Sequence, residues 1–228
     1  PVFFEYLSAY ENLFYLCRMS GFCDKALILD TLKRVGLEDV AQRKVSTFSY
    51  GMKQRLGIAQ ALLPRSRLIL LDEPTNGLDP HGIVGVRELV KRLCGELGVT
   101  VFISSHLLSE IEQTCDYVTI IDKGVKICES KVSSLVSMHN RIEFKTPDHA
   151  AFKEFAAGRG IKLLREETDE GCGIFVFEGV ETDIPRLISD LSASGIRTYG
   201  IGRYVQTLEE IFIEITGKDK RDFVSDRF

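Results

Sequence analysis

The sequence has no long apolar run. Its longer apolar segments, such as residues 68–71, fall far short of the roughly 20 residues that a membrane-spanning helix needs. No secretory signal is recognised at its start. The contents of hydrophobic residues (44%) and charged residues (27%) are ordinary for a globular protein, and we expect a soluble, cytoplasmic chain.

Basic charge and paired cysteines are also lacking. The net charge is only -4, so the chain offers no basic surface for nucleic acid, and we expect no nucleic-acid partner. The six cysteines are scattered, with no C-x-x-C pair and no nearby histidine at metal-binding spacing. Reduced thiols in the cytosol are the simplest interpretation of this pattern.

The first 64 residues are predicted to be helical. A capping box at residues 8–11 satisfies free N–H groups at the start of one helix, which ends near Gly21. A second amphipathic helix is predicted for residues 25–35. A third is predicted for residues 49–63, where Pro64 ends it.

Apolar strands alternate with helices in the next part of the chain. Strands are predicted for residues 67–72 and 100–105, with a helix that starts at Asp79-Pro80 between them. A helix at residues 107–115 and a hairpin at residues 117–128 follow. This alternation favours an α/β fold with a parallel sheet that is covered on both faces.

A third pattern begins after His139. Four strands and two helices follow in the order βαββαβ, which is typical of a split βαβ, ferredoxin-like α+β domain, and a last helix comes after them. The last residues are charged and are expected to form a frayed tail. We therefore predict the following division: residues 1–139 (1–64 helical, 65–139 core), residues 140–217 (C-terminal domain) and residues 218–228 (tail).

The first motif that can carry chemistry is Phe48-Ser49-Tyr50-Gly51-Met52. It places a serine hydroxyl and a glycine N–H at the start of a helix. There, unpaired N–H groups and the positive end of the helix dipole can bind a phosphate. The alternative interpretation is an ordinary capped amphipathic helix.

The second motif is the apolar strand that ends in Asp72-Glu73-Pro74, and the third is His106, at the end of the next strand. Ligands of doubly wound folds bind at the carboxyl ends of strands, where neighbouring side chains point in opposite directions. Asp72 could hold Mg²⁺, directly or through water, and Glu73 could deprotonate an attacking water. Taken alone, the acidic pair could equally be a solvated turn, and a lone histidine such as His106 is more often structural.

In combination these motifs resemble the ATP-binding cassette (ABC) family. The similar segments, in chain order, are the signature loop at residues 48–52, the Walker B strand at residues 68–73, the D-loop at residues 77–80 and the H-loop histidine at His106. The resemblance extends to about residue 137. It implies an ABC-type ATPase with a P-loop NTPase-like α/β core and a helical subdomain.

The resemblance also implies a role for each motif residue. Glu73 and His106 would be catalytic, and Asp72 would hold Mg²⁺. Asp79, in the D-loop, would lie at the interface of an ATPase dimer. Four signature residues would contact ATP that is bound to the other subunit: Ser49, Tyr50, Gly51 and Met52.

Within the family, the chain is most similar to exporters of drugs or peptide antibiotics, of the bacitracin and lantibiotic type. The S-x-G-M-K-Q-R-L run that starts at Ser49 and the Thr-Leu-Glu-Glu-Ile-Phe segment at residues 207–212 carry this resemblance. It implies ATP and Mg²⁺ as cofactors, transmembrane permease subunits, and a second ATPase subunit in a homodimer or heterodimer. It also implies a cytoplasmic location, peripheral on the inner face of the cell membrane.

Three features depart from the family pattern. Tyr50 stands in place of the usual glycine, and Met52 in place of a glutamine whose hydrogen bonds it cannot make. The chain also contains no G-x-x-x-x-G-K-[ST] loop, which predicts a fragment truncated ahead of Pro1 that does not hydrolyse ATP by itself. Two alternatives stay open: an ABC ATPase that moves no solute, and a module that serves only in docking or regulation.

Overall fold

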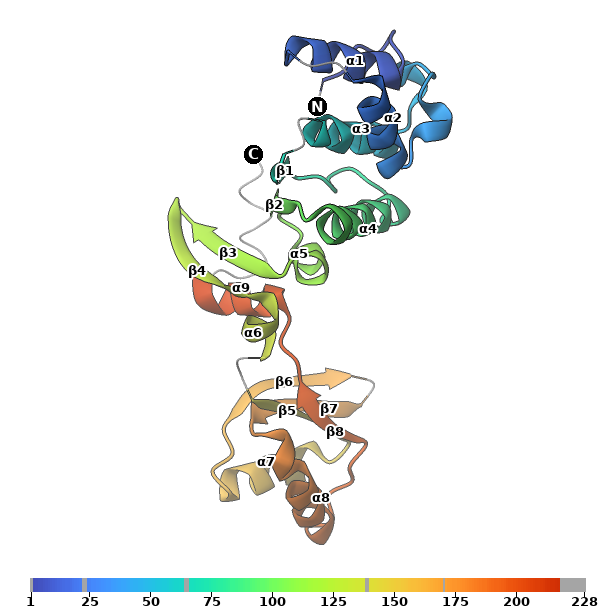
Figure 1. Ribbon diagram of the computed structural model, residues 1–228. Helices are drawn as coiled ribbons and strands as arrows, with labels where there is room; N and C mark the ends of the chain where they lie inside the picture. Colours follow the sequence, from blue (N-terminus) through green and yellow to red (C-terminus); the bar gives the residue numbers. More distant parts are fainter. Residues whose placement is uncertain (1, 22–23, 64–65, 138–139, 170, 218–228) are drawn as a thin grey trace. The chain divides into compact units, whose positions relative to one another are not determined.

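The computed structural model describes residues 2–21, 24–63, 66–137, 140–169 and 171–217 (Figure 1). The predicted tail, residues 218–228, lies outside the described residues. The chain forms two compact units, Pro1–Thr114 and Cys115–Phe228, and each has its own buried core.

The first unit begins with a helical layer. The predicted capping box is confirmed, because Ser8 Oγ accepts a hydrogen bond from Glu11 N at 3.1 Å and Glu11 Oε2 accepts one from Ser8 N at 2.7 Å. Leu13, Leu32 and Leu56, one from each α-helix, are fully buried in a common core. The elements of this layer are α1 (Ala9–Met19), α2 (Lys25–Arg34), the 3-10 helices η1 (Glu38–Val40) and η2 (Val45–Thr47), and α3 (Tyr50–Leu62).

Two parallel strands follow the helical layer. β1 (Leu68–Asp72) pairs with β2 (Thr100–Ser104), and α4 (Pro80–Leu97) connects them. As predicted, Asp79 caps α4, with Oδ1 accepting a hydrogen bond from Gly82 N at 2.8 Å. The short helix α5 (Leu108–Thr114) ends the unit.

The prediction that both faces of this parallel sheet are covered is wrong for the described residues. Ile69 is buried, but its neighbour Leu70 and the register partner of Leu70, Phe102, are 69% and 59% exposed. The apolar strand sequences predict a sheet with both faces buried. Among the described residues, helices cover only one face.

The second unit opens with a hairpin that the sequence predicted. β3 (Tyr117–Asp122) and β4 (Val125–Lys131) are antiparallel. Both turn residues, Lys123 (φ 49°) and Gly124 (φ 79°), have positive φ, which matches a two-residue turn whose twist fits a hairpin. The helix α6 (Val132–Ser137) follows and contacts the last helix, α9 (Leu208–Thr216).

A four-stranded antiparallel sheet forms the rest of the second unit. Its strand order is β6-β7-β5-β8, so β5 lies between β7 and β8. The chain order of strands and long helices is β5-α7-β6-β7-α8-β8, as the sequence predicted. The bounds are β5 (Arg141–Thr146), α7 (His149–Gly158), β6 (Leu163–Asp169), β7 (Cys172–Glu178), η3 (Glu181–Asp183), α8 (Ile184–Ala193) and β8 (Gly200–Tyr204).

A phenylalanine cluster holds α7 on this sheet. The ring of Phe152, on α7, lies 4.5 Å from that of Phe144 and 4.7 Å from that of Phe175. All three side chains are fully buried, and Leu191 of α8 joins the same core. Both helices pack on one face of the sheet (Figure 1), which is how an antiparallel sheet with one apolar face becomes a stable layer.

The compact units divide between Thr114 and Cys115, whereas the sequence placed a domain boundary at 139/140. The physical reason is the packing of the segment between these positions. The β3–β4 hairpin pairs with itself, and α6 contacts α9, which comes from the far end of the chain. Residues 115–137 therefore group with the residues that follow them.

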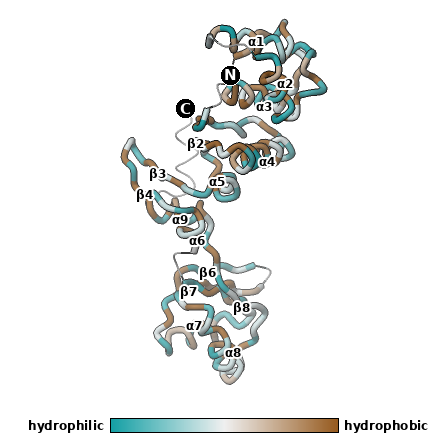
Figure 2. The backbone as a smooth tube through the Cα atoms, in the orientation of Figure 1, coloured by the Kyte–Doolittle hydropathy of each residue, from teal (hydrophilic) through white to brown (hydrophobic). Residues whose placement is uncertain are grey.

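Apolar and polar residues alternate along the helices of both units (Figure 2). Among the described residues, no helix is both long enough and apolar enough to cross a bilayer.

An ion pair at the start of α7 makes the stability of the second unit depend on pH. Asp148 Oδ1 lies 2.5 Å from Arg197 Nη2, and hydrogen bonds from Arg197 lower the pKa of Asp148 to about 2. A carboxyl whose pKa is lower in the folded state stabilises that state above its ordinary pKa, and this contribution is lost as the pH falls through the folded pKa. Stability should therefore decrease between pH about 4 and about 2.

We expect the substitution Arg197→Met to weaken this dependence. Thermal unfolding followed by circular dichroism should show a smaller fall in Tm for Arg197→Met than for the unmodified chain over that pH interval. Arg186→Met, at an exposed position on α8, is the matched control and should keep the original dependence. Equal pH profiles for all three proteins would contradict the assignment.

Candidate active site

The ends of β1 and β2 bring the predicted catalytic side chains together. Glu73 follows β1 directly and has a φ of 47°, a conformation that non-glycine residues rarely adopt. Its backbone N donates hydrogen bonds to the carbonyl oxygen of Ser104 at 3.1 Å and to Ser104 Oγ at 3.2 Å. The turn is therefore held against β2 in a strained form, which is common at functional sites.

Glu73 and His106 are in direct contact. His106 Nδ1 lies 2.8 Å from Glu73 Oε2, although 33 positions separate the two residues in the sequence. The side chains are 33% and 40% exposed, respectively, so a ligand in solution can reach both. A carboxylate next to an imidazole at a strand end can accept a proton and orient a polar ligand.

Asp72 is held by a residue that the sequence analysis missed. Ser104 Oγ donates a hydrogen bond to Asp72 Oδ1 at 2.5 Å, and the two residues are partners in the register of β1 and β2. Aligning the ends of the two predicted strands would have pointed to Ser104. This serine contacts both Asp72 and the backbone N–H of Glu73, so it ties the two acidic residues to one strand end.

The donor set at Asp72 fits one kind of magnesium site. The described residues contain no group of three or more His, Cys, Asp or Glu side chains that could hold a metal on its own. Mg²⁺ in phosphoryl-transfer enzymes is often bound through only one or two carboxylates, together with phosphates of the substrate. Asp72 is exposed and can offer such a carboxylate oxygen.

The signature residues lie at the start of α3, as predicted. Ser49 is the N-cap, and its Oγ accepts a hydrogen bond from Met52 N at 3.3 Å. Tyr50 and Gly51 are the first two helical residues, and the Tyr50 side chain is exposed. The serine hydroxyl and the helix start therefore face solvent, where an anion can approach.

The start of α3 also contacts the segment that leads into α4. A Cβ atom on Gly77 would lie 3.4 Å from Cε1 of Tyr50, and one on Gly51 would lie 3.6 Å from Cδ2 of Leu78. The structure thus brings the predicted signature and D-loop segments side by side, a contact that the sequence analysis did not foresee. The site residues form two sets, one at the strand ends and one where α3 meets this segment.

A family model described as "ABC transporter" matches residues 1–76. An ABC transporter ATP-binding protein from Bacillus subtilis (strain 168), YhcH, is 37% identical over 232 residues, which cover 97% of this chain and 71% of YhcH. The chain belongs to the ATP-binding proteins of ABC transporters. The family predicted from the motifs is therefore confirmed, and these proteins are ATPases that bind and hydrolyse ATP.

Other ABC ATP-binding proteins agree with this assignment. The bacitracin transport ATP-binding protein BcrA from Bacillus licheniformis is 37% identical over 229 residues, 95% of this chain and 71% of BcrA. The lantibiotic transport ATP-binding protein SrtF from Streptococcus pyogenes is 45% identical over 131 residues, 58% of this chain and 56% of SrtF.

Solved structures support the fold. MJ1267, an ATP-binding cassette of an ABC transporter in its ADP conformation, gives a TM-score of 0.52 at 19% identity, over 58% of this chain and 60% of that one. The protein cbiO1 from Clostridium perfringens, part of the ABC transporter complex cbiONQ, gives a TM-score of 0.55 at 23% identity, over 68% of this chain and 59% of that one. Both likenesses support the ABC ATPase fold that the sequence predicted.

Proposed function

We propose that the strand-end residues of this ABC ATP-binding protein carry out ATP hydrolysis. The observation that supports this proposal is the 2.8 Å contact between Glu73 and His106. Glu73 acts as the general base that takes a proton from the attacking water, and Nδ1 of His106 holds the Glu73 carboxylate in place. The second ring nitrogen of His106 is then available to the γ-phosphate of ATP.

Asp72 is the proposed ligand of Mg²⁺, directly or through a water molecule. Ser104 fixes the Asp72 carboxylate through one oxygen, which leaves the other oxygen for the metal. The metal, when bound, neutralises charge on the phosphate oxygens. Asp72 and Glu73 are thus given different tasks by different contacts, because Ser104 binds the Asp72 carboxylate and His106 binds that of Glu73.

We propose that the signature residues act on ATP held by a second subunit. Ser49, Tyr50, Gly51 and Met52 form the start of a 13-residue helix, which can bind a phosphate through its N–H groups and its dipole. Such a site is completed in a head-to-tail dimer with two-fold symmetry. We propose the same interface for Asp79, because its D-loop segment packs against the signature residues Tyr50 and Gly51 of its own chain.

The proposed biological task is export of drugs or peptide antibiotics by a transporter with separate permease subunits. The similarity to BcrA and SrtF supports this. The C-terminal residues that resemble this branch form α9, and Thr207 caps it through a hydrogen bond from Glu210 N at 3.3 Å. The protein is then peripheral on the inner face of the cell membrane, and the β6-β7-β5-β8 sheet with α7 and α8 is a ferredoxin-like accessory domain.

An antibiotic-tolerance assay tests the export proposal. Cells that express the complete transporter should grow at higher concentrations of bacitracin or of a lantibiotic than cells without it. The same transporter with Glu73→Gln should give no protection, because hydrolysis drives the transport cycle. If the unmodified transporter hydrolyses ATP in membranes but protects against none of these compounds, the antibiotic-export assignment is wrong.

A further inference from the structure

The helix that follows His106 is short and weakly anchored. α5 contains seven residues, and Ile111 is its one buried residue. His106 lies between β2 and α5, and Leu107 N donates a hydrogen bond to Ser105 Oγ at 3.0 Å within the same turn. The position of the His106 ring therefore depends on β2, which precedes it in the chain, and on the packing of α5, which follows it.

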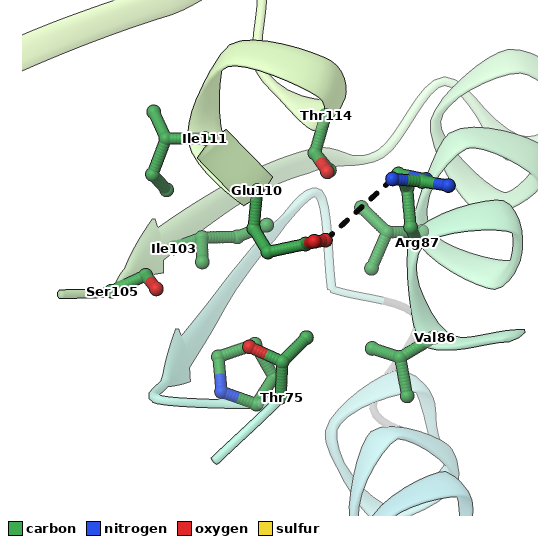
Figure 3. A pocket seen from close by; sticks show the side chains of 10 residues that line it. Thr75, Val86, Arg87, Ile103, Ser105, Glu110, Ile111 and Thr114 are labelled. Atoms are coloured by element: carbon green, nitrogen blue, oxygen red, sulfur yellow. Dashed lines mark ion pairs between the residues drawn. The ribbon is translucent and has the colours of Figure 1, made fainter. Parts of the chain in front are cut away.

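Arg87, on α4, contacts α5 at two successive turns. Its Nη1 atom lies 3.7 Å from Glu110 Oε2, and it also donates a hydrogen bond to Gln113 Oε1. The Arg87 and Glu110 side chains are only 19% and 18% exposed, so this ion pair is less screened by water than a surface pair. Figure 3 shows Arg87 and Glu110 pointing toward each other, and both line the same pocket.

The packing beneath this ion pair is incomplete. A cavity of about 20 Å³, enough for roughly one water molecule, separates α5 from the turn that carries Pro74 and Thr75 (Figure 3). Thr75 is 8% exposed, and its hydroxyl has no hydrogen-bond partner among the described residues. Packing on this side is therefore incomplete, and Arg87 adds two polar contacts between α4 and α5: a hydrogen bond to Gln113 and an ion pair with Glu110 at 3.7 Å.

We infer that Arg87 is a positioning residue for ATP hydrolysis, acting through His106. By holding Glu110 and Gln113, it docks α5 on α4 and keeps the His106 ring within hydrogen-bond distance of Glu73. This inference rests on the proposed roles of Glu73 and His106. Arg87 lies on α4, the helix that the D-loop residue Asp79 caps. The inferred role therefore connects the D-loop helix to His106.

The test is Arg87→Met in the full-length ATPase, which removes the charge and keeps most of the side-chain volume. We expect kcat to fall by about 10-fold to about 10²-fold, the scale for misplacing a catalytic group by up to 1 Å. The KM for ATP should change by less than about 2-fold, because the nucleotide contacts are untouched. In a His106→Ala background, Arg87→Met should have almost no further effect on kcat, since no imidazole is left to position.

Arg92→Met is the matched control. Arg92 lies on the same helix, but its Nη2 donates to the backbone oxygen of Arg34 at 2.6 Å, on the side of α2. This variant should retain the kcat of the unmodified protein. If Arg87→Met does not fold, Glu110→Gln replaces it in the same cycle, because it removes the ion pair with no change of shape.

Three outcomes would overturn the inference: an unchanged kcat for Arg87→Met, an equal loss of kcat with and without His106, or a parallel rise in KM. Each would leave Arg87 as a structural residue only. The proposed function fails separately, if His106→Ala alone leaves kcat unchanged. Loss of kcat in His106→Ala together with normal kcat in Arg87→Met refutes only the positioning role.

Discussion

Replacing Glu73 with Gln is expected to leave ATP binding nearly intact and to slow hydrolysis by about 10²-fold or more, the scale for losing a positioned general base. Glutamine has almost the same shape and can still accept a hydrogen bond from His106. It cannot take up a proton from water. The substitution therefore separates the chemical role of the carboxylate from its contact with the histidine 2.8 Å away.

The backbone conformation of Glu73 does not favour one of the two side chains over the other. Glu73 has a positive φ, and the strain of that conformation is the same for glutamine as for glutamate. ATP affinity and phosphate release should be measured on the same full-length preparation, with Glu88→Gln, at an exposed position on α4, as the control. An equal loss of affinity and turnover would mean that Glu73 is structural rather than catalytic.

Features set by a few neighbouring residues were predicted well from the sequence. The capping box at Ser8 and the cap at Asp79 are confirmed, because each depends on a hydrogen bond within three positions. The turn at Lys123-Gly124 is confirmed for the same reason, since its backbone conformation is local. The motif residues at the strand ends were found because residue type and chain order alone identify them.

Contacts between distant positions were not predicted. Ser104 reaches Asp72 only because β1 and β2 pair in one particular register. Arg87 reaches Glu110 only because α5 packs beside α4. The exposure of Leu70 was missed for a related reason. An apolar strand pattern reports that a side chain prefers burial, and only the packing of other elements decides whether it is covered.

The difference between the predicted and observed division of the chain follows the same logic. The hairpin of β3 and β4 was assigned to the first domain because it continues a strand–helix alternation. In the structure, α6 behind this hairpin contacts α9, 70 or so positions later, and a contact of that range leaves no trace in a local pattern. A local pattern therefore does not report that residues 115–137 group with the residues that follow them.

Substituting Ser49 with Arg is expected to abolish the ATP-dependent dimer. Ser49 caps α3 and is exposed, so a long cationic side chain at this position would occupy the space where we propose that the partner's phosphate binds. Loss of the cap is a separate effect, worth about 0.5–2 kcal/mol of stability. Ser49→Ala also loses the cap hydroxyl but leaves the space open, which makes it the matched control.

The decisive experiment uses Glu73→Gln throughout, so that bound ATP is not consumed. Size-exclusion chromatography of this full-length protein should show a dimer with ATP and a monomer without it. Adding Ser49→Arg should prevent the dimer, because both composite sites lose their signature. A mixture of the two proteins should form a weaker dimer, in which one of the two sites still closes. Ser49→Ala should dimerise better than Ser49→Arg, since it loses the cap hydroxyl but does not block the space for the phosphate.

If Ser49→Arg dimerises with ATP as well as the protein with an intact signature does, Ser49 does not act on the partner's nucleotide. The start of α3 would then be no more than the capped end of a helix.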